Sequence, residues 1–275
     1  MGLTDTQQAL LDAWLPSAEL VKDHSWGLVG TLVLELVHNG ERYIAKAGDA
    51  ADHHLVREIR AHRNWLSPWT SRGRAPQFVD ADDEAKLLLT RFLPGQLVHG
   101  TPAEWAPATY DEAGELLAQF HQQSAVPDDD YESRENRRTL ANLGKPHRIE
   151  PDLTERLQAE IAAWPTPLAI LVPTHGDWQP RNWLTDNGII RVIDFGRADL
   201  RPAYTDLARL AAQQFRSNPE LESAFLSGYG SDPREPDVWH RAQLREAINT
   251  CIWAHQVGDE PFEQQGHRMI AEAIS

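Results

Sequence analysis

The stretch of 23 residues from His175 to Arg197 constrains the fold more than any other part of this chain. It reads HGDWQPRNWLTDNGIIRVIDFGR. An apolar run from Ile189 to Ile193 follows the tripeptide Asp186-Asn187-Gly188, a pattern that predicts a tight hairpin turn leading into a buried strand. The strand ends at Asp194, so it is expected to hold this carboxylate in a fixed place.

Three polar residues of this stretch have the chemistry that phosphoryl transfer requires. Asp177 and Asn182 are five residues apart, and Asp194 follows twelve residues later. Transfer of a terminal phosphoryl group passes through a loose transition state, so the protein mainly positions the acceptor and neutralises charge through magnesium. One carboxylate must face the acceptor hydroxyl, while a second carboxylate and an amide oxygen bind hard cations. Each residue alone fits a cap or a loop, but the three in this order predict a phosphoryl-transfer site.

The motifs HGDWQPRN, IDFGRA and RPAYTDLARLA resemble the catalytic core of the aminoglycoside phosphotransferase and choline kinase family, whose members are related to protein kinases. Weaker matches extend the resemblance over most of the chain. It implies that Asp177 is the catalytic aspartate, that Asn182 and Asp194 bind the metal, and that Asp206 is a buried acid that braces the catalytic loop.

The same resemblance implies an α+β, two-lobed protein-kinase-like fold. Residues 1–94 are expected to form a small N-terminal nucleotide-binding lobe, with an antiparallel sheet and one helix. Residues 95–275 are expected to form a larger, mainly helical lobe that carries the catalytic loop and the acceptor site. The nucleotide is expected to bind in the cleft between the lobes, where concave sites tend to form.

A lysine and a glutamate near the N-terminus match the nucleotide site of kinases. Apolar residues from Leu28 to Val37 predict a strand, Asn39-Gly40 a tight turn, and a returning strand ends at Lys46. A helix from about Ala50 to Trp65 carries Glu58. In kinases a strand lysine touches the nucleotide phosphates and a glutamate of the next helix holds it. On spacing alone, an exposed lysine and a solvated glutamate are the alternative.

Further nucleotide contacts are expected on either side of this pair. Two glycines near the start of the first hairpin match a loop over the phosphates, although a simple turn fits their spacing. The apolar strand that begins at Leu87 leads to Pro94-Gly95, and the resemblance places the backbone before it next to the nucleotide base. The residues concerned are Gly27, Gly30, Arg91, Phe92 and Leu93. The implied cofactors are ATP or GTP and Mg²⁺.

The segment after Asp194 indicates a small-molecule acceptor. Only seven residues separate Gly196 from Tyr204, where a helix to Phe215 is expected. A protein kinase needs a long activation segment there, followed by Ala-Pro-Glu. Candidate acceptor contacts are two unusual residues of the motifs and four in the C-terminal helices, which offer cation–π and charge-assisted contacts to an ammonium group: Trp178, Arg197, Trp253, Asp259, Glu260 and Glu263.

Composition narrows the partners and the compartment. A formal charge of −15 argues against a nucleic-acid partner and permits a cationic acceptor. The single cysteine, Cys251, cannot form an internal disulfide and is expected to be a small core residue in a reducing compartment. No apolar run is long enough to span a membrane, so we expect a cytoplasmic protein without a membrane partner.

Two clusters of polar residues are expected to lie at the surface. His53, His54 and His62 fall on one predicted helix, but no acid or cysteine completes a zinc spacing beside them. The acids of the segment from Pro127 to Glu135 predict a solvated loop or helix start, with an acceptor-lining role as the alternative.

Three functions are compatible with these motifs. The first is an ATP-dependent kinase for an aminoglycoside or another basic antibiotic, and the second is a metabolic kinase for choline, an amino sugar or a similar molecule. The third is a nucleotide-binding pseudoenzyme that acts as a scaffold. The scaffold is disfavoured because Lys46, Asp177, Asn182 and Asp194 are all present, and a scaffold has no chemical need for the full set.

Overall fold

The computed structural model describes residues 2–25 and 30–274, and the chain divides into two compact units. The first unit contains residues 1–123, 173–200 and 218–231, and the second contains residues 124–172, 201–217 and 232–275. The first unit therefore holds both the N-terminal sheet and the whole stretch from Asp177 to Asp194. This division differs from the boundary expected after residue 94, because the catalytic loop groups with the N-terminal residues.

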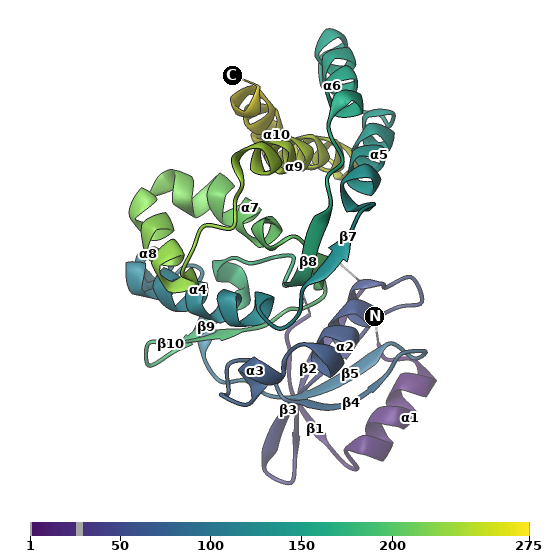
Figure 1. Cartoon of the computed structure of the whole chain (residues 1–275). Coiled ribbons are helices and arrows are strands. Elements are labelled where there is room, and N and C mark those ends of the chain that lie inside the picture. The colour runs from purple at the N-terminus through teal and green to yellow at the C-terminus, as the bar shows by residue number, and fades with distance from the viewer. Residues whose placement is uncertain (1, 26–29, 275) are drawn as a thin grey trace. The chain divides into compact units, whose positions relative to one another are not determined.

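The first unit contains the expected antiparallel sheet, which has five strands in the order β1-β2-β3-β5-β4 (Figure 1). Asn39 and Gly40 have φ angles of 51° and 79°, which confirms the predicted turn, because the left-handed region suits these two residue types. The strands are β1 Glu19–Asp23, β2 Leu32–His38, β3 Glu41–Ala47, β4 Phe78–Asp82 and β5 Leu87–Arg91.

One helix packs on each face of this sheet. Side chains alternate between the two faces of a strand, so Leu87 and Leu89 of β5 join the apolar cluster of α1, Asp5–Trp14. Leu88, between them, packs with Leu55 and Ile59 of α2, His54–Asn64. Helix α2 thus has a fixed position on the sheet, and so do its polar side chains.

Two glycines allow helices α4 (Pro107–His121) and α8 (Pro219–Tyr229) of the first unit to pack closely side by side (Figure 1). A methyl group on Gly114 would overlap the carbonyl oxygen of Phe225, and one on Gly228 would overlap that of Asp111. His121 is buried, and its Nδ1 lies 2.8 Å from the hydroxyl of Tyr229. The remaining elements are α3 Ser67–Thr70, β6 Gln96–Leu97, η1 Pro102–Trp105, η2 Pro180–Asn182, β9 Trp183–Asp186 and β10 Ile189–Val192.

The second unit is mainly helical and has its own core. Its longest helices are α9 (Pro236–Val257) and α10 (Glu260–Ala273), which form a hairpin whose close contact depends on Gly266. A Cβ at Gly266 would lie 2.6 Å from the backbone nitrogen of Cys251. The other elements are β7 Val126–Asp128, α5 Tyr131–Leu143, α6 Pro151–Ala163, η3 Ala203–Leu207, α7 Ala208–Leu210 and η4 Ala211–Phe215. The chain crosses from one unit to the other within strands β8 (Ala169–Thr174) and β11 (Asp199–Arg201).

Two expectations about helices need correction. The segment from Tyr204 to Phe215 is not one regular helix, because a 3₁₀ turn, a short α-helix and a π turn follow one another there. Helix α2 begins at His54 rather than near Ala50, because the carboxylate of Asp52 accepts the backbone N–H groups of His54 and Leu55 and so caps the helix. Within the described residues, the helices are all too short or too polar to cross a bilayer.

Candidate active site

The hairpin of β9 and β10 delivers Asp194, as the sequence predicts. Asn187 and Gly188 form its turn with φ angles of 52° and 79°, and Ile190 and Val192 are buried. Asp194 follows two residues after the strand and has a φ of 67°. A left-handed backbone at a residue other than glycine is uncommon, and such residues concentrate at functional sites. The Asp194 side chain is exposed, while the next residue, Phe195, is fully buried.

The loop from Asp177 to Asn182 closes on itself through the Asp177 carboxylate. The amide nitrogen Nδ2 of Asn182 donates to the backbone oxygen of Asp177 at 2.8 Å and to its Oδ2 at 2.9 Å. Gln179 Nε2 donates to Asp177 Oδ1 at 2.6 Å, and Arg181 donates to Oδ2 at 2.8 Å. Four hydrogen bonds therefore fix the position and orientation of this acid.

Two backbone contacts join this loop to the strand that carries Asp194. The N–H of Ile193 donates to the backbone oxygen of Asn182 at 3.0 Å, and the ring Nε2 of His175 lies 3.1 Å from the backbone oxygen of Ile193. Asp177, Asn182 and Asp194 are therefore brought together by the local hairpin and by these contacts.

Aromatic side chains form the base of this loop. The Trp178 ring is fully buried, with ring centroids of Trp69 at 5.7 Å, His175 at 5.5 Å and Trp183 at 5.4 Å. The sequence analysis considered Trp178 as an acceptor contact. Its 0 % exposure leaves no surface for a small molecule. Trp178 is therefore a core residue that supports the loop.

Lys46 and Glu58 form the ion pair that the sequence predicts. The ammonium Nζ of Lys46 on β3 donates to both carboxylate oxygens of Glu58 on α2, at 2.7 and 2.9 Å. Burial acts to lower the pKa of Lys46, but the negative charges of Glu58 and then Asp194 outweigh it and leave the pKa raised. The lysine therefore stays charged, and Asp194 is close enough to contribute to its electrostatics.

Two histidines of α2 contact the segment after Asp194, and the sequence analysis missed both contacts. Nδ1 of His54 lies 3.0 Å from the backbone oxygen of Gly196. The ring of His62 is 92 % buried, with its centroid 5.6 Å from that of Phe195. The expectation that His62 is a surface residue is wrong, because the fold covers it with Phe195. Burial, followed by the charge of Lys46, lowers its pKa to about 3, so this ring is neutral.

The other predicted nucleotide contacts lie in the same unit. Gly27 is outside the described residues, and Gly30 approaches Asp49 so closely that a side chain at position 30 would overlap its carboxylate. The backbone N–H of Arg91 bonds to Gln77 and that of Phe92 to Arg42, both at 2.9 Å. Leu93 follows β5 and is partly buried. Contacts of these residues with a nucleotide stay a prediction.

The predicted acceptor residues of the second unit lie near the turn between α9 and α10. Trp253 is exposed and its ring centroid lies 5.9 Å from that of Phe262. Asp259 caps α10 by accepting the N–H of Phe262, and Glu260 is exposed in its first turn. Glu263, in contrast, is buried. A direct contact of Glu263 with a solvent-borne acceptor is therefore not supported.

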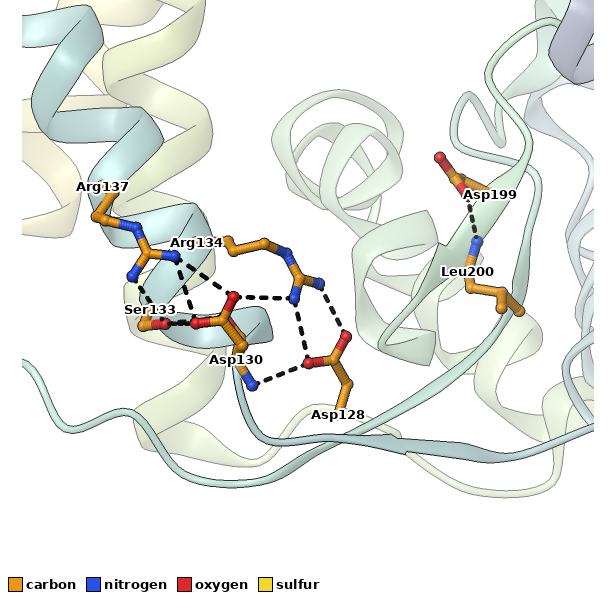
Figure 2. A network of polar contacts seen from close by, with 7 residues as sticks. All are labelled: Asp128, Asp130, Ser133, Arg134, Arg137, Asp199 and Leu200. Carbon is orange, nitrogen blue, oxygen red and sulfur yellow. Dashed lines mark hydrogen bonds and ion pairs between the residues drawn. The ribbon is translucent and has the colours of Figure 1, made fainter.

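The acidic segment around Asp128 begins helix α5, as one of its two readings predicted. Figure 2 shows that Asp128 and Asp130 share Arg134 of this helix, at 2.8 and 3.3 Å, and that Asp130 also contacts Arg137 at 3.3 Å. The hydrogen bond from Arg134 lowers the pKa of Asp128, and the one from Ser133 lowers the pKa of Asp130. These acids are thus matched by charges within their own segment.

Two other predicted residues have clear positions but untested roles. Arg197 is exposed directly after the buried Phe195-Gly196, and Asp199, two residues later, forms an ion pair with Arg60 at 2.8 Å. Asp206 is buried in η3. A contact between Arg197 and the acceptor stays a prediction.

The chain belongs to the phosphotransferase enzyme family (APH), whose family model matches residues 30–245. It is accordingly a small-molecule phosphotransferase, and its α+β fold is of the kinase-like type.

Solved structures of kinases that modify antibiotics share this fold over almost the full length of both chains. The macrolide 2′-phosphotransferase MphH of Brachybacterium faecium has a TM-score of 0.64 and 18 % identity, covering 97 % of this chain and 98 % of its own. A thermostable mutant of aminoglycoside phosphotransferase APH(4)-Ia, in a complex with AMP-PNP and hygromycin B, has a TM-score of 0.68 and 15 % identity, with 98 % of each chain covered. The gentamicin complex of APH(2″)-IIa has a TM-score of 0.67 and 16 % identity, with coverages of 98 % and 97 %. Among curated proteins the comparison finds no match.

Proposed function

We propose that this protein transfers the γ-phosphoryl group of ATP or GTP to a hydroxyl of a small cationic acceptor, an aminoglycoside or another basic antibiotic. The observation that carries the proposal is the assembly of two independent parts of a kinase site in one compact unit. The Asp177–Asn182 loop with Asp194 is one part, and the Lys46–Glu58 ion pair is the other. The electrostatic effect of Asp194 on Lys46 links the two.

Asp177 is the group that faces the acceptor hydroxyl in this proposal. The new bond forms between the hydroxyl oxygen and the γ-phosphorus, and the bond from that phosphorus to the bridging oxygen breaks, releasing the nucleoside diphosphate. The hydroxyl proton passes to Asp177, late in the reaction, because a loose transition state needs little base assistance. Gln179, Arg181 and Asn182 hold the carboxylate in place during this transfer.

Asn182 and Asp194 are the residues that would hold Mg²⁺. Asn182 donates through its amide nitrogen to Asp177, so its carbonyl oxygen is the atom of that side chain able to bind a cation. The exposed Asp194 carboxylate supplies a second hard oxygen ligand, and such ligands suit Mg²⁺. When bound, the metal neutralises charge on the transferred phosphoryl group and its neighbours.

Lys46 is proposed to hold the nucleotide phosphates. Its ammonium lies between the Glu58 carboxylate and the charge of Asp194, so its position is fixed before the nucleotide binds. Glu58 balances the charge of the lysine in the free protein and holds its ammonium in place. The side chain of Lys46 is 20 % exposed.

The class of acceptor rests on the charge of the chain and on its structural neighbours. A net charge of −15 attracts cations to the protein surface, and the neighbours are named as a macrolide phosphotransferase, an aminoglycoside phosphotransferase bound to hygromycin B and a gentamicin complex. Arg197 directly follows Asp194-Phe195-Gly196, at a position where aminoglycoside kinases commonly have an acid. A metabolic kinase for an amine-bearing alcohol, such as choline or an amino sugar, is therefore the second candidate.

A product assay across an acceptor panel tests the proposal. We expect ADP release and a phosphorylated product with one or more members of a panel of aminoglycosides, macrolides, basic peptide antibiotics, choline and amino sugars. Stimulation by choline or an amino sugar alone would favour the metabolic role. Nucleotide binding without product for any hydroxyl-bearing compound, neutral sugars included, would instead support a scaffold, while product with a neutral sugar alone would contradict the cationic preference.

A further inference from the structure

The hairpin of α9 and α10 in the second unit brings together four side chains that commonly bind transition metals. Cys251 and His255 are one helical turn apart on α9, and Glu263 and His267 are one turn apart on α10. Residues at this spacing share a face of a helix. The two helices run in opposite directions from the turn at Gly258, so Cys251 faces His267 and His255 faces Glu263.

The distances among these atoms match those of a metal site. Sγ of Cys251 lies 3.4 Å from Nε2 of His267, and Oε1 of Glu263 lies 3.3 Å from Nδ1 of His255 and 3.9 Å from Nε2 of His267. Ligand atoms of Cys251, Glu263 and His267 all lie within 4.8 Å of one another. Tetrahedral Zn²⁺ with ordinary bond lengths would separate its ligand atoms by about 3.3–3.6 Å. Three ligand atoms are thus close together, and Nδ1 of His255 lies beside the carboxylate oxygen of one of them.

A buried carboxylate oxygen lies among these ligand atoms. Glu263 is 96 % buried, and its Oε1 accepts no hydrogen bond of good geometry from any described residue, although the imidazoles of His255 and His267 are its ion-pair neighbours. Its other oxygen, Oε2, lies 3.3 Å from the guanidinium Nη1 of Arg148. A buried carboxylate needs a balancing positive charge, and a metal bound by the same imidazoles would supply it. The arrangement, with Arg148 on the outer oxygen, matches the way that surrounding residues orient metal ligands.

We propose that Cys251, His255, Glu263 and His267 form a structural Zn²⁺ site that joins α9 to α10. A thiolate, two imidazoles and one carboxylate suit zinc, whereas Mg²⁺ and Ca²⁺ prefer oxygen ligands only. Four protein ligands leave no open position for a substrate, which is the feature of structural rather than catalytic zinc sites. The proposal concerns the second unit alone and does not depend on the proposed phosphotransferase activity.

The packing around Cys251 fixes its position between the two helices. The residue has no exposed surface, and Gly266 brings the backbone of α10 against it. Because a cysteine binds Zn²⁺ as the thiolate, binding releases the thiol proton to the buffer, and affinity is expected to increase with pH.

Zinc binding by the full-length protein tests the site directly. After treatment with a chelator, titration with Zn²⁺ is expected to show one ion per chain and to raise the unfolding temperature, and excess Mg²⁺ is expected not to displace this ion. Co²⁺ in place of Zn²⁺ is expected to give the charge-transfer absorption of a cobalt–thiolate bond. Absence of Zn²⁺ binding by the wild-type protein, or a Co²⁺ complex without that absorption, would overturn the proposal.

Two variants and a control locate the site. Cys251→Ser is expected to remove the cobalt–thiolate absorption, and His267→Gln to weaken zinc binding at least roughly 100-fold, beyond the effect of an outer residue. His267 is partly exposed, so its replacement is expected to leave the fold intact. His240→Gln changes an exposed histidine on α9, the helix that carries Cys251, and should bind Zn²⁺ like the wild type. Equal binding by His267→Gln and the control would show that the cluster is a hydrogen-bonded core and not a metal site.

Discussion

Replacement of His62 by leucine is expected to remove a large part of the acid sensitivity of this protein. The pKa of His62 falls from 6.5 in the unfolded chain to about 3 in the folded protein. The folded state therefore binds fewer protons than the unfolded state as the pH falls below 6.5, and stability is lost in that direction. Above this value the histidine is neutral in both states, and it contributes no pH dependence.

The size of the effect follows from these two pKa values. Linkage gives a loss of about 1 kcal/mol in the free energy of unfolding between about pH 7.5 and about pH 5.8, and of about 2 kcal/mol by about pH 5. The first interval stays above the isoelectric point near 5.2, so the protein keeps a net negative charge. His62→Leu should not show this loss in the free energy of unfolding between the two pH values. At neutral pH it should be at least as stable as the wild type, because His62 Nδ1 is buried without a hydrogen bond from the described residues.

Urea unfolding at the two pH values measures this difference. Fluorescence reports on the first unit through its three fully buried tryptophans, Trp69, Trp178 and Trp183. His53→Gln is the matched control, because it changes an exposed histidine just before the same helix and should keep the wild-type slope. If His62→Leu loses as much stability as the wild type between the two pH values, the ring is not buried in its neutral form and the reasoning fails.

Three other substitutions test the packing and the site. Gly114→Ala is expected to lower the free energy of unfolding by about 1–3 kcal/mol, because its methyl group would overlap the backbone of α8. The control is Gly144→Ala, where a methyl group has room at a helix end. It should change the free energy of unfolding far less in the same urea titration. Glu58→Gln leaves the largely buried charge of Lys46 without its partner and is expected to lower that free energy by up to about 3 kcal/mol and to raise the KM for ATP; an unchanged KM would contradict the assigned role. Arg181→Leu removes a charge-assisted hydrogen bond to Asp177 and is expected to reduce kcat about 10-fold or more, with little change in thermal stability because the side chain is half exposed.

Local sequence signals predicted most of the elements that carry the site. A tight hairpin turn requires a left-handed backbone, which asparagine and glycine adopt more readily than other residues. Asn-Gly occupies positions 39–40 and 187–188, and both hairpins form there. The pairing of Lys46 with Glu58 follows from the order of strand and helix in a kinase-like fold. In each case a short stretch of chain contains the information.

Contacts between distant segments account for what the sequence did not predict. His62 lies seven residues after Leu55 on the buried face of α2. A histidine there gives no apolar signal, and the contact that covers its ring comes from Phe195, which is 133 positions further along the chain. Trp178 is followed by polar residues, yet Trp69 and Trp183 enclose it. The cluster at Cys251 lacks the short motif typical of zinc sites, because its ligands come from two helices whose register depends on the glycine contact at position 266. The i,i+4 spacing on both helices was the available signal.

The central claim is that Asp177 carries out phosphoryl transfer in a site that also holds the nucleotide. The most direct measurement is the rate of ADP release with a saturating acceptor for the wild type, Asp177→Asn and the control Asp237→Asn, which changes an exposed acid of α9. We expect Asp177→Asn to lose on the order of 10²- to 10⁴-fold in kcat while ATP still binds, and the control to retain full activity. If Asp177→Asn turns over at the wild-type rate, the assignment of this site is wrong.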